Sequence, residues 1–233
     1  RKTLVWFPDY RTTYDALEAA IALVELKRRY TVGFRQSAPQ IFKAYATDLY
    51  QFDLAYRHFI FASDQAKPIL REQGLIKTIE DIYTNWFLDE LGEAWSDSLS
   101  QDWQLEGIPS QTEFFRQNIT PILQRNDREK VFVLISDALR YEVASELAEV
   151  IEKELRGDLD LKPQFGVLPS ITRLGMAALL PGKTLELIPG VNNVLRDGLN
   201  TQGAEARAQV LHKNSGVEAT ALSATDLLAM TSE

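Results

Sequence analysis

The sequence predicts an α/β protein, in which a helical domain over residues 1–126 is followed by an α/β domain over residues 127–233. In the first half, apolar residues recur at helical spacing, which is typical of helices that pack together. A polar, charged connector, Arg125 to Lys130, then precedes an apolar run, Val131 to Ile135, of the kind found in buried parallel strands. These observations place the domain boundary at residue 126.

Composition restricts the class of protein. The chain has 233 residues and a hydrophobic fraction of 45%, enough for one large domain or two small ones with a real core. It has no apolar run of about 18 residues and no signal-peptide core after Arg1, so we expect no membrane span and no membrane partner. The net charge of −8 disfavours a broad basic surface for nucleic acid and leaves room for a local basic groove.

The chain contains no cysteine. This excludes disulfides and thiolate metal sites, and it suits a reducing cytoplasm. Any metal must therefore be bound by oxygen ligands or histidine. His58 and His212 have no partner at the spacing of metal ligands, so we interpret both as structural or solvent-facing. The sequence also lacks Walker A, G-x-S-x-G and Rossmann motifs, which argues against P-loop, serine-hydrolase and dinucleotide chemistry.

Start signals place two helices early in the chain. The first begins at Thr12 or Thr13 and ends at the basic residues 27–29, and the second begins at Ser37 with Pro39 in its first turn. The second carries a stripe that we interpret as core packing and not as a platform for stacked bases. The members of this stripe are Phe42, Tyr45, Leu49, Phe52, Tyr56 and Phe59.

Two further helical signals follow in the first half. The pattern from Ile79 to Trp95 is helical, and its acidic face is typical of a solvated surface. Ser110 and Glu113 have the spacing of a capping box, which predicts a helix toward Leu123.

The second half is expected to open with a right-handed βαβ unit. Its strands are residues 131–136 and 159–168, and its helix runs from Arg140 to Leu155 and ends at Gly157. One long strand with short companions makes a thin sheet, so the α/β part is expected to be incomplete. The later elements are a helix after Thr172, a hairpin of residues 184–188 and 191–195, a helix over 204–213, a strand over 217–222 and a helix capped by Ser223.

Two positions in the second half are candidates for chemistry. Asp137 follows the apolar run, and the carboxyl ends of such strands are where α/β sheets place ligand and metal chemistry. The alternative is that Asp137 caps the next helix. Thr172 is expected at a helix start, where its hydroxyl is either another cap or a nucleophile, and Ser170 is the rival hydroxyl.

The stretches from Val131 to Glu142 and from Leu168 to Pro181 resemble the PglZ family. This family is the phosphatase-like component of bacterial BREX phage-defence systems and a branch of the alkaline phosphatase superfamily. The resemblance extends from about Tyr45 to Glu233. The supporting residues in the helical half are Asp48-Leu49-Tyr50, Asp53, Tyr56-Arg57-x-Phe59 and Tyr83-x-Asn85-x-Phe87-Leu88.

The resemblance implies roles for individual residues. Asp137 would be a metal ligand and Thr172 the nucleophile, with Ser170 as the alternative. The metal would be Zn²⁺, Mn²⁺ or Mg²⁺, and its remaining Asp and His ligands are expected downstream of residue 233. Arg140 and Arg173 are candidate phosphate contacts. Arg140 has an ordinary alternative as well, because Glu142 is available as an ion-pair partner.

The resemblance also implies a function. The fold would be the opening part of an alkaline phosphatase-like α/β sandwich, and the chain a fragment of a bacterial, cytoplasmic, metal-dependent phosphate-ester hydrolase. Its substrates would be phosphomonoesters or phosphodiesters, the latter including DNA. Its partners would be the DNA methyltransferase and ATPase of the defence system. A non-catalytic assembly platform is the alternative, and the fragment alone is expected to be inactive and to bind metal weakly or not at all.

Overall fold

The computed structural model describes residues 7–66, 74–99, 105–125, 130–155, 158–191 and 193–230. The chain divides into two compact units, of which the first is Arg1–Gly107 with Leu139–Leu161 and the second is Ile108–Ala138 with Lys162–Glu233. Residues 139–161, expected in the α/β part, thus group with the helical unit. The expected boundary at residue 126 and the expected helix end at Gly157 lie outside the described residues.

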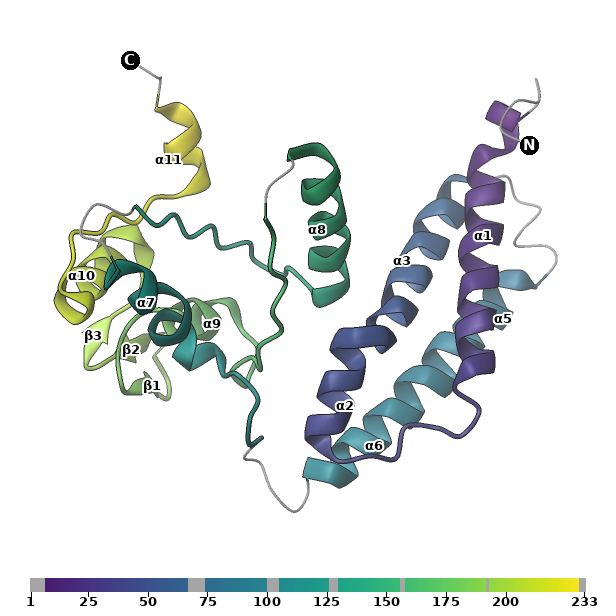
Figure 1. Cartoon of the computed structure of the whole chain (residues 1–233), viewed down its shortest axis with the longest axis horizontal. Coiled ribbons are helices and arrows are strands. Elements are labelled where there is room, and N and C mark those ends of the chain that lie inside the picture. Colours follow the sequence, from purple (N-terminus) through teal and green to yellow (C-terminus); the bar gives the residue numbers. More distant parts are fainter. Residues whose placement is uncertain are drawn as a thin grey trace. The chain divides into compact units, whose positions relative to one another are not determined.

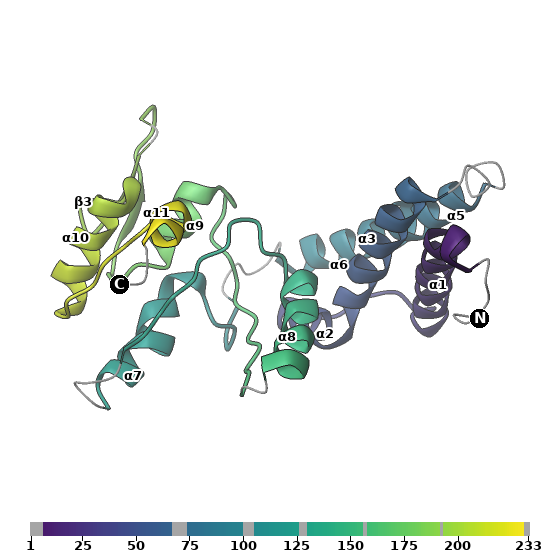
Figure 2. The same ribbon diagram turned by 90° about the horizontal axis from the view of Figure 1, so that it is seen from above.

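The described part of the first unit is helical (Figure 1). Figures 1 and 2 both show α1, α3 and α5 side by side, and α1 packs on both other helices. The elements are α1 (Phe7–Arg29), α2 (Ala38–Ala44), the π-helical η1 (Tyr45–Leu49), α3 (Tyr50–Gln65), α5 (Leu75–Ile82), the π-helical η2 (Tyr83–Leu88), α6 (Asp89–Leu99) and α8 (Tyr141–Leu155).

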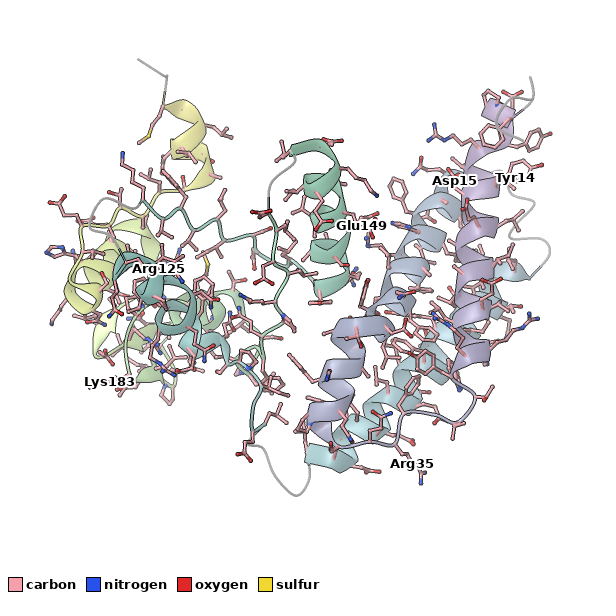
Figure 3. The ribbon with its side chains drawn as sticks, in the orientation of Figure 1. Tyr14, Asp15, Arg35, Arg125, Glu149 and Lys183 are labelled. Carbon is pink, nitrogen blue, oxygen red and sulfur yellow. The ribbon has the colours of Figure 1, made fainter. Side chains whose placement is uncertain are left out.

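Helix boundaries follow the sequence signals in part. The second helix starts as expected, because Ser37 is the N-cap of α2 and its backbone N–H donates to the Gln40 side chain at 3.1 Å. The first helix starts earlier than expected, at Phe7, and its exposed first turns carry the ion pair of Arg11 and Asp15. Asp15 is labelled in Figure 3. The start signal at Thr12 therefore lies inside α1.

The aromatic stripe forms the core of the first unit. Phe52 and Phe59 are fully buried, and the Phe52 ring stacks on Phe87 of η2 with centroids 4.2 Å apart. Tyr45 and Tyr56 are partly buried and pack against this cluster. The interpretation of the stripe as core packing is confirmed.

One partly buried carboxylate joins three helical segments of this unit. Asp53 on α3 accepts hydrogen bonds from the hydroxyls of Tyr45 and Tyr83, the first residues of η1 and η2. Burial and the Asp53 carboxylate raise the pKa of both hydroxyls, so both stay protonated donors at neutral pH. Both π-helical segments are thereby tied to α3.

Helix α8 belongs to the first unit because it docks on α3 through polar contacts. Arg57 Nη2 lies 2.6 Å from Glu146 Oε2, and His58 Nε2 lies 2.8 Å from Glu146 Oε1. The hydroxyl of Tyr141 donates to the Ala46 carbonyl at 3.0 Å. Glu149, labelled in Figure 3, is exposed on the same helix.

The second unit combines short helical segments with a small antiparallel sheet in the order β1-β2-β3 (Figure 1). Leu185 pairs with Arg196 across β1 and β2, which confirms the expected hairpin. The elements are η3 (Gln111–Glu113), the π-helical η4 (Phe115–Ile119), α7 (Thr120–Leu123), α9 (Thr172–Ala178), β1 (Leu185–Leu187), β2 (Val194–Arg196), β3 (Leu199–Asn200), α10 (Gly203–Ser215) and α11 (Ala224–Ala229).

The core of this unit is small. Leu174 and Ala177 of α9 pack on Val194 of β2. Arg196 is only 2% exposed, and its guanidinium donates to the carbonyls of Thr112 and Gly182 at 3.0 and 2.9 Å. The buried guanidinium therefore ties η3 and the turn before β1 to the sheet.

The expected βαβ unit does not form within the described residues. Residues 131–136 have no regular secondary structure, and 159–168 contributes a single parallel bridge, from Phe165 to Ser110. Residues 217–222 are not a strand either. The reason is physical, because a strand that is apolar on both faces needs hydrogen-bonded neighbours on both sides.

Several terminal signals are confirmed. Thr172 is the first residue of α9, α10 covers the expected 204–213, and Ser223 caps α11 by accepting the Asp226 N–H at 3.1 Å. The expected continuous helix after Ser110 is instead divided into η3, η4 and α7. None of the helices in the described part of the chain is long and apolar enough to cross a membrane.

Candidate functional site

The second unit brings together the two residues that the sequence singled out. The Thr172 hydroxyl donates to the Asp137 carboxylate, with Oγ1 3.2 Å from Oδ1 and 3.1 Å from Oδ2. The two residues are 35 positions apart, and both are exposed. They form an accessible hydroxyl–carboxylate pair at the surface of this unit.

A tight turn presents Asp137. The next residue, Ala138, has a φ of +56°, in the left-handed region that residues other than glycine rarely adopt. Its backbone N–H donates to Asp137 Oδ1 at 3.0 Å. Helix α8 begins only at Tyr141, so Asp137 does not occupy its N-cap position. Backbone strain at this turn, of about 1–3 kcal/mol, is a feature that clusters at functional sites.

Thr172 is not used as a cap. Ile171 occupies the N-cap position of α9 and makes no side-chain cap hydrogen bond. The Thr172 hydroxyl donates instead to Asp137. Leu174 and Ala177, on the same helix, pack against Val194 of the sheet. Ser170 is exposed as well, but the hydrogen bond to Asp137 recorded in the described residues comes from Thr172.

The two candidate arginines have different surroundings. Arg140 lies in the first unit, where its Nη2 is 2.7 Å from Oε1 of Glu142, a side chain that is 1% exposed. Arg57 Nε lies 3.8 Å from the same oxygen. The structure thus has Arg140 in its ordinary ion pair. Arg173 follows Thr172 on α9, and its Nε is buried without a hydrogen-bond partner among the described residues.

Sequence analysis missed Gln111, which contacts the segment before α9 and α9 itself. Its Oε1 accepts the Val167 N–H at 3.0 Å, and its Nε2 donates to the Gly175 carbonyl at 3.2 Å. Periodicity gives no signal for such a residue, because the contacts are made to backbone atoms far away in the chain. The only local hint was its place inside the Ser110–Glu113 pattern.

The donors present fit part of a divalent metal site. Asp137 offers two carboxylate oxygens and Thr172 a hydroxyl beside them, and oxygen donors of this kind suit Zn²⁺, Mn²⁺ or Mg²⁺. Among the described residues, no group of three or more His, Cys, Asp or Glu side chains is arranged to hold a metal ion. A complete site would need further ligands.

Comparisons with known proteins agree with the site's position in the chain. A family model described as the BREX system PglZ alkaline phosphatase-like domain matches residues 114–233, which include both Asp137 and Thr172. No solved structure matches the chain.

Two curated relatives match nearly the whole chain. The alkaline phosphatase-like protein BrxZ of Escherichia coli O9:H4 (strain HS) is 40% identical over 232 residues, which is 95% of this chain and 26% of that protein. The alkaline phosphatase-like protein PglZ of Bacillus cereus (strain H3081.97) is 37% identical over 235 residues, 99% of this chain and 27% of that protein. The chain thus spans about a quarter of the length of these relatives. Because the family model covers more than half of it, the chain belongs to the PglZ family of alkaline phosphatase-like proteins from BREX systems.

Proposed function

We propose that the protein containing this chain hydrolyses phosphate esters, with Thr172 as the nucleophile and Asp137 as a metal ligand. The observation that carries the proposal is the hydrogen bond between the Thr172 hydroxyl and the Asp137 carboxylate. Membership of an alkaline phosphatase-like family supports the reaction class. The whole protein is taken to be longer than the chain, as its relatives are.

The reaction would proceed in two displacements. Oγ1 of Thr172 attacks phosphorus, the bond from phosphorus to the leaving oxygen breaks, and the leaving group takes up a proton. Water then attacks the phosphothreonine, which releases phosphate or a phosphomonoester and restores the hydroxyl. Each step forms one bond to phosphorus and breaks one.

Asp137 would orient the nucleophile. Its carboxylate accepts a hydrogen bond from the Thr172 hydroxyl. This bond would direct a lone pair of Oγ1 away from Asp137 and toward the substrate. A carboxylate alone is too weak a base to remove the proton of an alcohol, so its part here is orientation. A divalent cation, when bound, would lower the hydroxyl pKa and neutralise charge on the phosphoryl oxygens.

We assign Arg173 as the first candidate for binding the phosphate. A guanidinium donates two parallel hydrogen bonds to phosphate oxygens, and Arg173 directly follows the nucleophile on α9. Arg140 is the second candidate, and it would have to exchange its contact with Glu142 for a substrate contact. Replacing each with lysine should raise KM more for Arg173 than for Arg140.

Chromogenic phosphate esters test the proposed function. A chain extended to the length of its relatives is assayed with p-nitrophenyl phosphate and bis(p-nitrophenyl) phosphate in Zn²⁺, Mn²⁺ and Mg²⁺. We expect metal-dependent turnover that falls at least about a thousandfold in Thr172→Ala and changes little in the matched variant Ser170→Ala. Loss in Ser170→Ala with retention in Thr172→Ala would move the nucleophile to Ser170.

An assembly platform is the second candidate function. The observation that favours it is the exposed apolar run from Phe132 to Ile135, which offers a surface for another protein segment. The proposed partners are the DNA methyltransferase and ATPase of the same defence system. A double variant, Asp137→Ala with Thr172→Ala, separates the two functions. An enzyme should lose hydrolysis and keep its partners in co-purification, whereas a platform should lose partners or lose nothing.

A further inference from the structure

We propose that Gln111 is a positioning residue for Thr172. It would hold the first turn of α9 so that the threonine hydroxyl meets Asp137. The catalytic role of this positioning rests on the proposed function. The positioning itself is argued from the geometry of the second unit. Within the described part of the chain, Gln111 itself makes no hydrogen bond to Thr172 or Asp137.

The side-chain amide of Gln111 joins two backbone segments that flank Thr172. Its oxygen accepts from the Val167 N–H at 3.0 Å, five positions before the threonine, and its nitrogen donates to the Gly175 carbonyl at 3.2 Å, three positions after it. Gly175 is almost one helical turn beyond Thr172, so a fixed Gly175 carbonyl sets the direction of that turn. One amide thus bridges the chain on both sides of the nucleophile.

The backbone of Gln111 is itself anchored. Its N–H donates to the Phe165 carbonyl at 2.9 Å, and the Phe165 N–H donates to the Pro109 carbonyl at 2.7 Å. The neighbouring Thr112 carbonyl accepts from the buried Arg196 guanidinium at 3.0 Å. The amide therefore extends from a point that is tied to the sheet.

The surroundings leave room for this amide. A Cβ added at Gly175 would lie 3.4 Å from Nε2, and one added at Gly166 would lie 3.7 Å from Oε1. These are ordinary van der Waals distances, so the amide reaches the two backbone segments without crowding. The two contacts use opposite ends of the amide: its oxygen accepts from Val167, and its nitrogen donates to a Gly175 carbonyl that also accepts the Leu179 N–H at 3.3 Å.

Asp137 has little else to hold it in place. Within the described residues, its side chain makes hydrogen bonds with Thr172 and with the adjacent Ala138 N–H. The residues before it, 131–136, have no regular secondary structure. The anchored partner of the pair is therefore Thr172, and its anchor includes Gln111.

The absence of cysteine from the chain allows a direct test without any substrate. Thr172→Cys introduces a single thiol, whose alkylation by iodoacetamide at neutral pH in the presence of a chelator follows its thiolate fraction. A carboxylate in contact with the thiol disfavours the thiolate, so adding Asp137→Asn should raise the alkylation rate about threefold to tenfold. This ratio measures the contact between positions 137 and 172.

Gln111→Met, which keeps the side-chain length and removes both hydrogen bonds, should bring this ratio close to one. Gln111→Glu keeps the acceptor for Val167 and loses the donor to Gly175, so it should give an intermediate ratio. Gln117→Met, at an exposed glutamine of η4, is the matched control and should leave the ratio unchanged. Circular dichroism melts check that each variant is folded. If Gln111→Met does not fold, the ratio measured in Gln111→Glu decides the test.

An unchanged ratio in folded Gln111→Met or Gln111→Glu overturns the proposal. A ratio near one in the chain that keeps Gln111 also overturns it, because positions 137 and 172 would then not be in contact. A lowered ratio supports it. Since no catalysis is measured, failure of the proposed hydrolysis is a separate result: Gln111 can pass this test in a protein that hydrolyses nothing.

Discussion

Ala138 shows how a single residue shapes the candidate site. Its left-handed backbone, at a φ of +56°, turns the chain directly after Asp137 and lets its N–H bind the carboxylate. Such a conformation is strained in an L-residue and unstrained in glycine. This conformation was not predictable from the sequence, because alanine is an ordinary helix former and stands next to a predicted helix start.

Substitution of Ala138 tests this strain. Ala138→Gly should leave the chain as stable or stabilise it by up to about 1 kcal/mol, whereas Ala138→Val should destabilise the turn by about 1–2 kcal/mol. The Asp137→Asn effect on a thiol at position 172 should survive the glycine and shrink with the valine. Urea unfolding and thiol alkylation report the two quantities. A stabilising valine would show that the turn is not left-handed.

Asp197 is a second residue whose chemistry makes a prediction. Backbone N–H groups of Thr184 and Lys183, with the Thr184 hydroxyl, donate to its carboxylate and hold its pKa below the ordinary value. A depressed folded-state pKa stabilises the fold above the unfolded-state pKa of about 4, and this stability is lost as the pH falls through the lower folded-state value.

Thermal melts at several pH values between about 6 and 2.5 check this. The melting temperature of the second unit should fall on acidification, and Asp197→Asn should make that fall smaller. Asparagine is a suitable replacement because Asp197 has a φ of +49°, which asparagine tolerates. An equally steep fall in Asp197→Asn would assign the acid sensitivity to other carboxylates.

At the scale of elements, helices were predictable where the pattern is local. The stripe from Phe42 to Phe59, the cap at Ser37 and the cap at Ser223 all depend on residues within a few positions of each other. The π-helical turns at Tyr45 and Tyr83 were not predictable, because the hydroxyls of both tyrosines donate to the carboxylate of Asp53. That residue is 8 positions from Tyr45 and 30 from Tyr83.

The prediction of a strand at residues 131–136 was wrong because strand formation depends on residues far away in the chain. A strand is stable only with hydrogen-bonded neighbours, and an apolar sequence cannot report whether the neighbours are present. The candidate site divides in the same way. Asp137 and Thr172 were identified from motifs, whereas Gln111 makes its contacts through backbone atoms that carry no sequence signal.

The docking of α8 on α3 makes a prediction at this scale. Arg57 contacts both Glu146 and the buried Glu142, and its hydrogen bond lowers the pKa of the Glu146 carboxyl. Arg57→Met should destabilise the first unit by about 1–3 kcal/mol, because Glu142 would lose one of the two arginines that contact it in the described part of the chain and keep Arg140.

The exposed ion pair of Arg11 and Asp15 supplies the control, since Arg11→Ala should change stability by less than about 1 kcal/mol. Amide hydrogen exchange locates the effect, and α8 should exchange faster in Arg57→Met than in Arg11→Ala. Equal exchange of α8 in both variants would mean that the polar contacts do not hold it.

At the scale of the whole molecule, the main feature is an exposed apolar run at residues 132–135. Phe132 and Leu134 are 83% and 88% exposed. Runs of this kind are buried in parallel sheets or aggregate when free. The chain spans about a quarter of its relatives' length, so longer members of the family contain residues that this chain lacks.

We therefore expect the run to become a strand in a longer chain. The amides of residues 132–135 should exchange at least tenfold more slowly in a chain extended to the length of its relatives than in the present one. Leu134→Asp should improve the solubility of the present chain and destabilise the extended one. Similar exchange in both chains would show that the run is a docking surface for another molecule or a free segment.

The central claim is that Thr172 receives the phosphoryl group, and trapping it is the most direct test. The extended chain is mixed with p-nitrophenyl phosphate and a divalent metal, quenched in acid during turnover and digested for peptide mass spectrometry. The account predicts a phosphoryl group on Thr172, with none on Ser170, and no trapped phosphate in Thr172→Ala. Turnover that persists in Thr172→Ala, with no phosphoryl group on the Thr172 peptide of the parent, would contradict it.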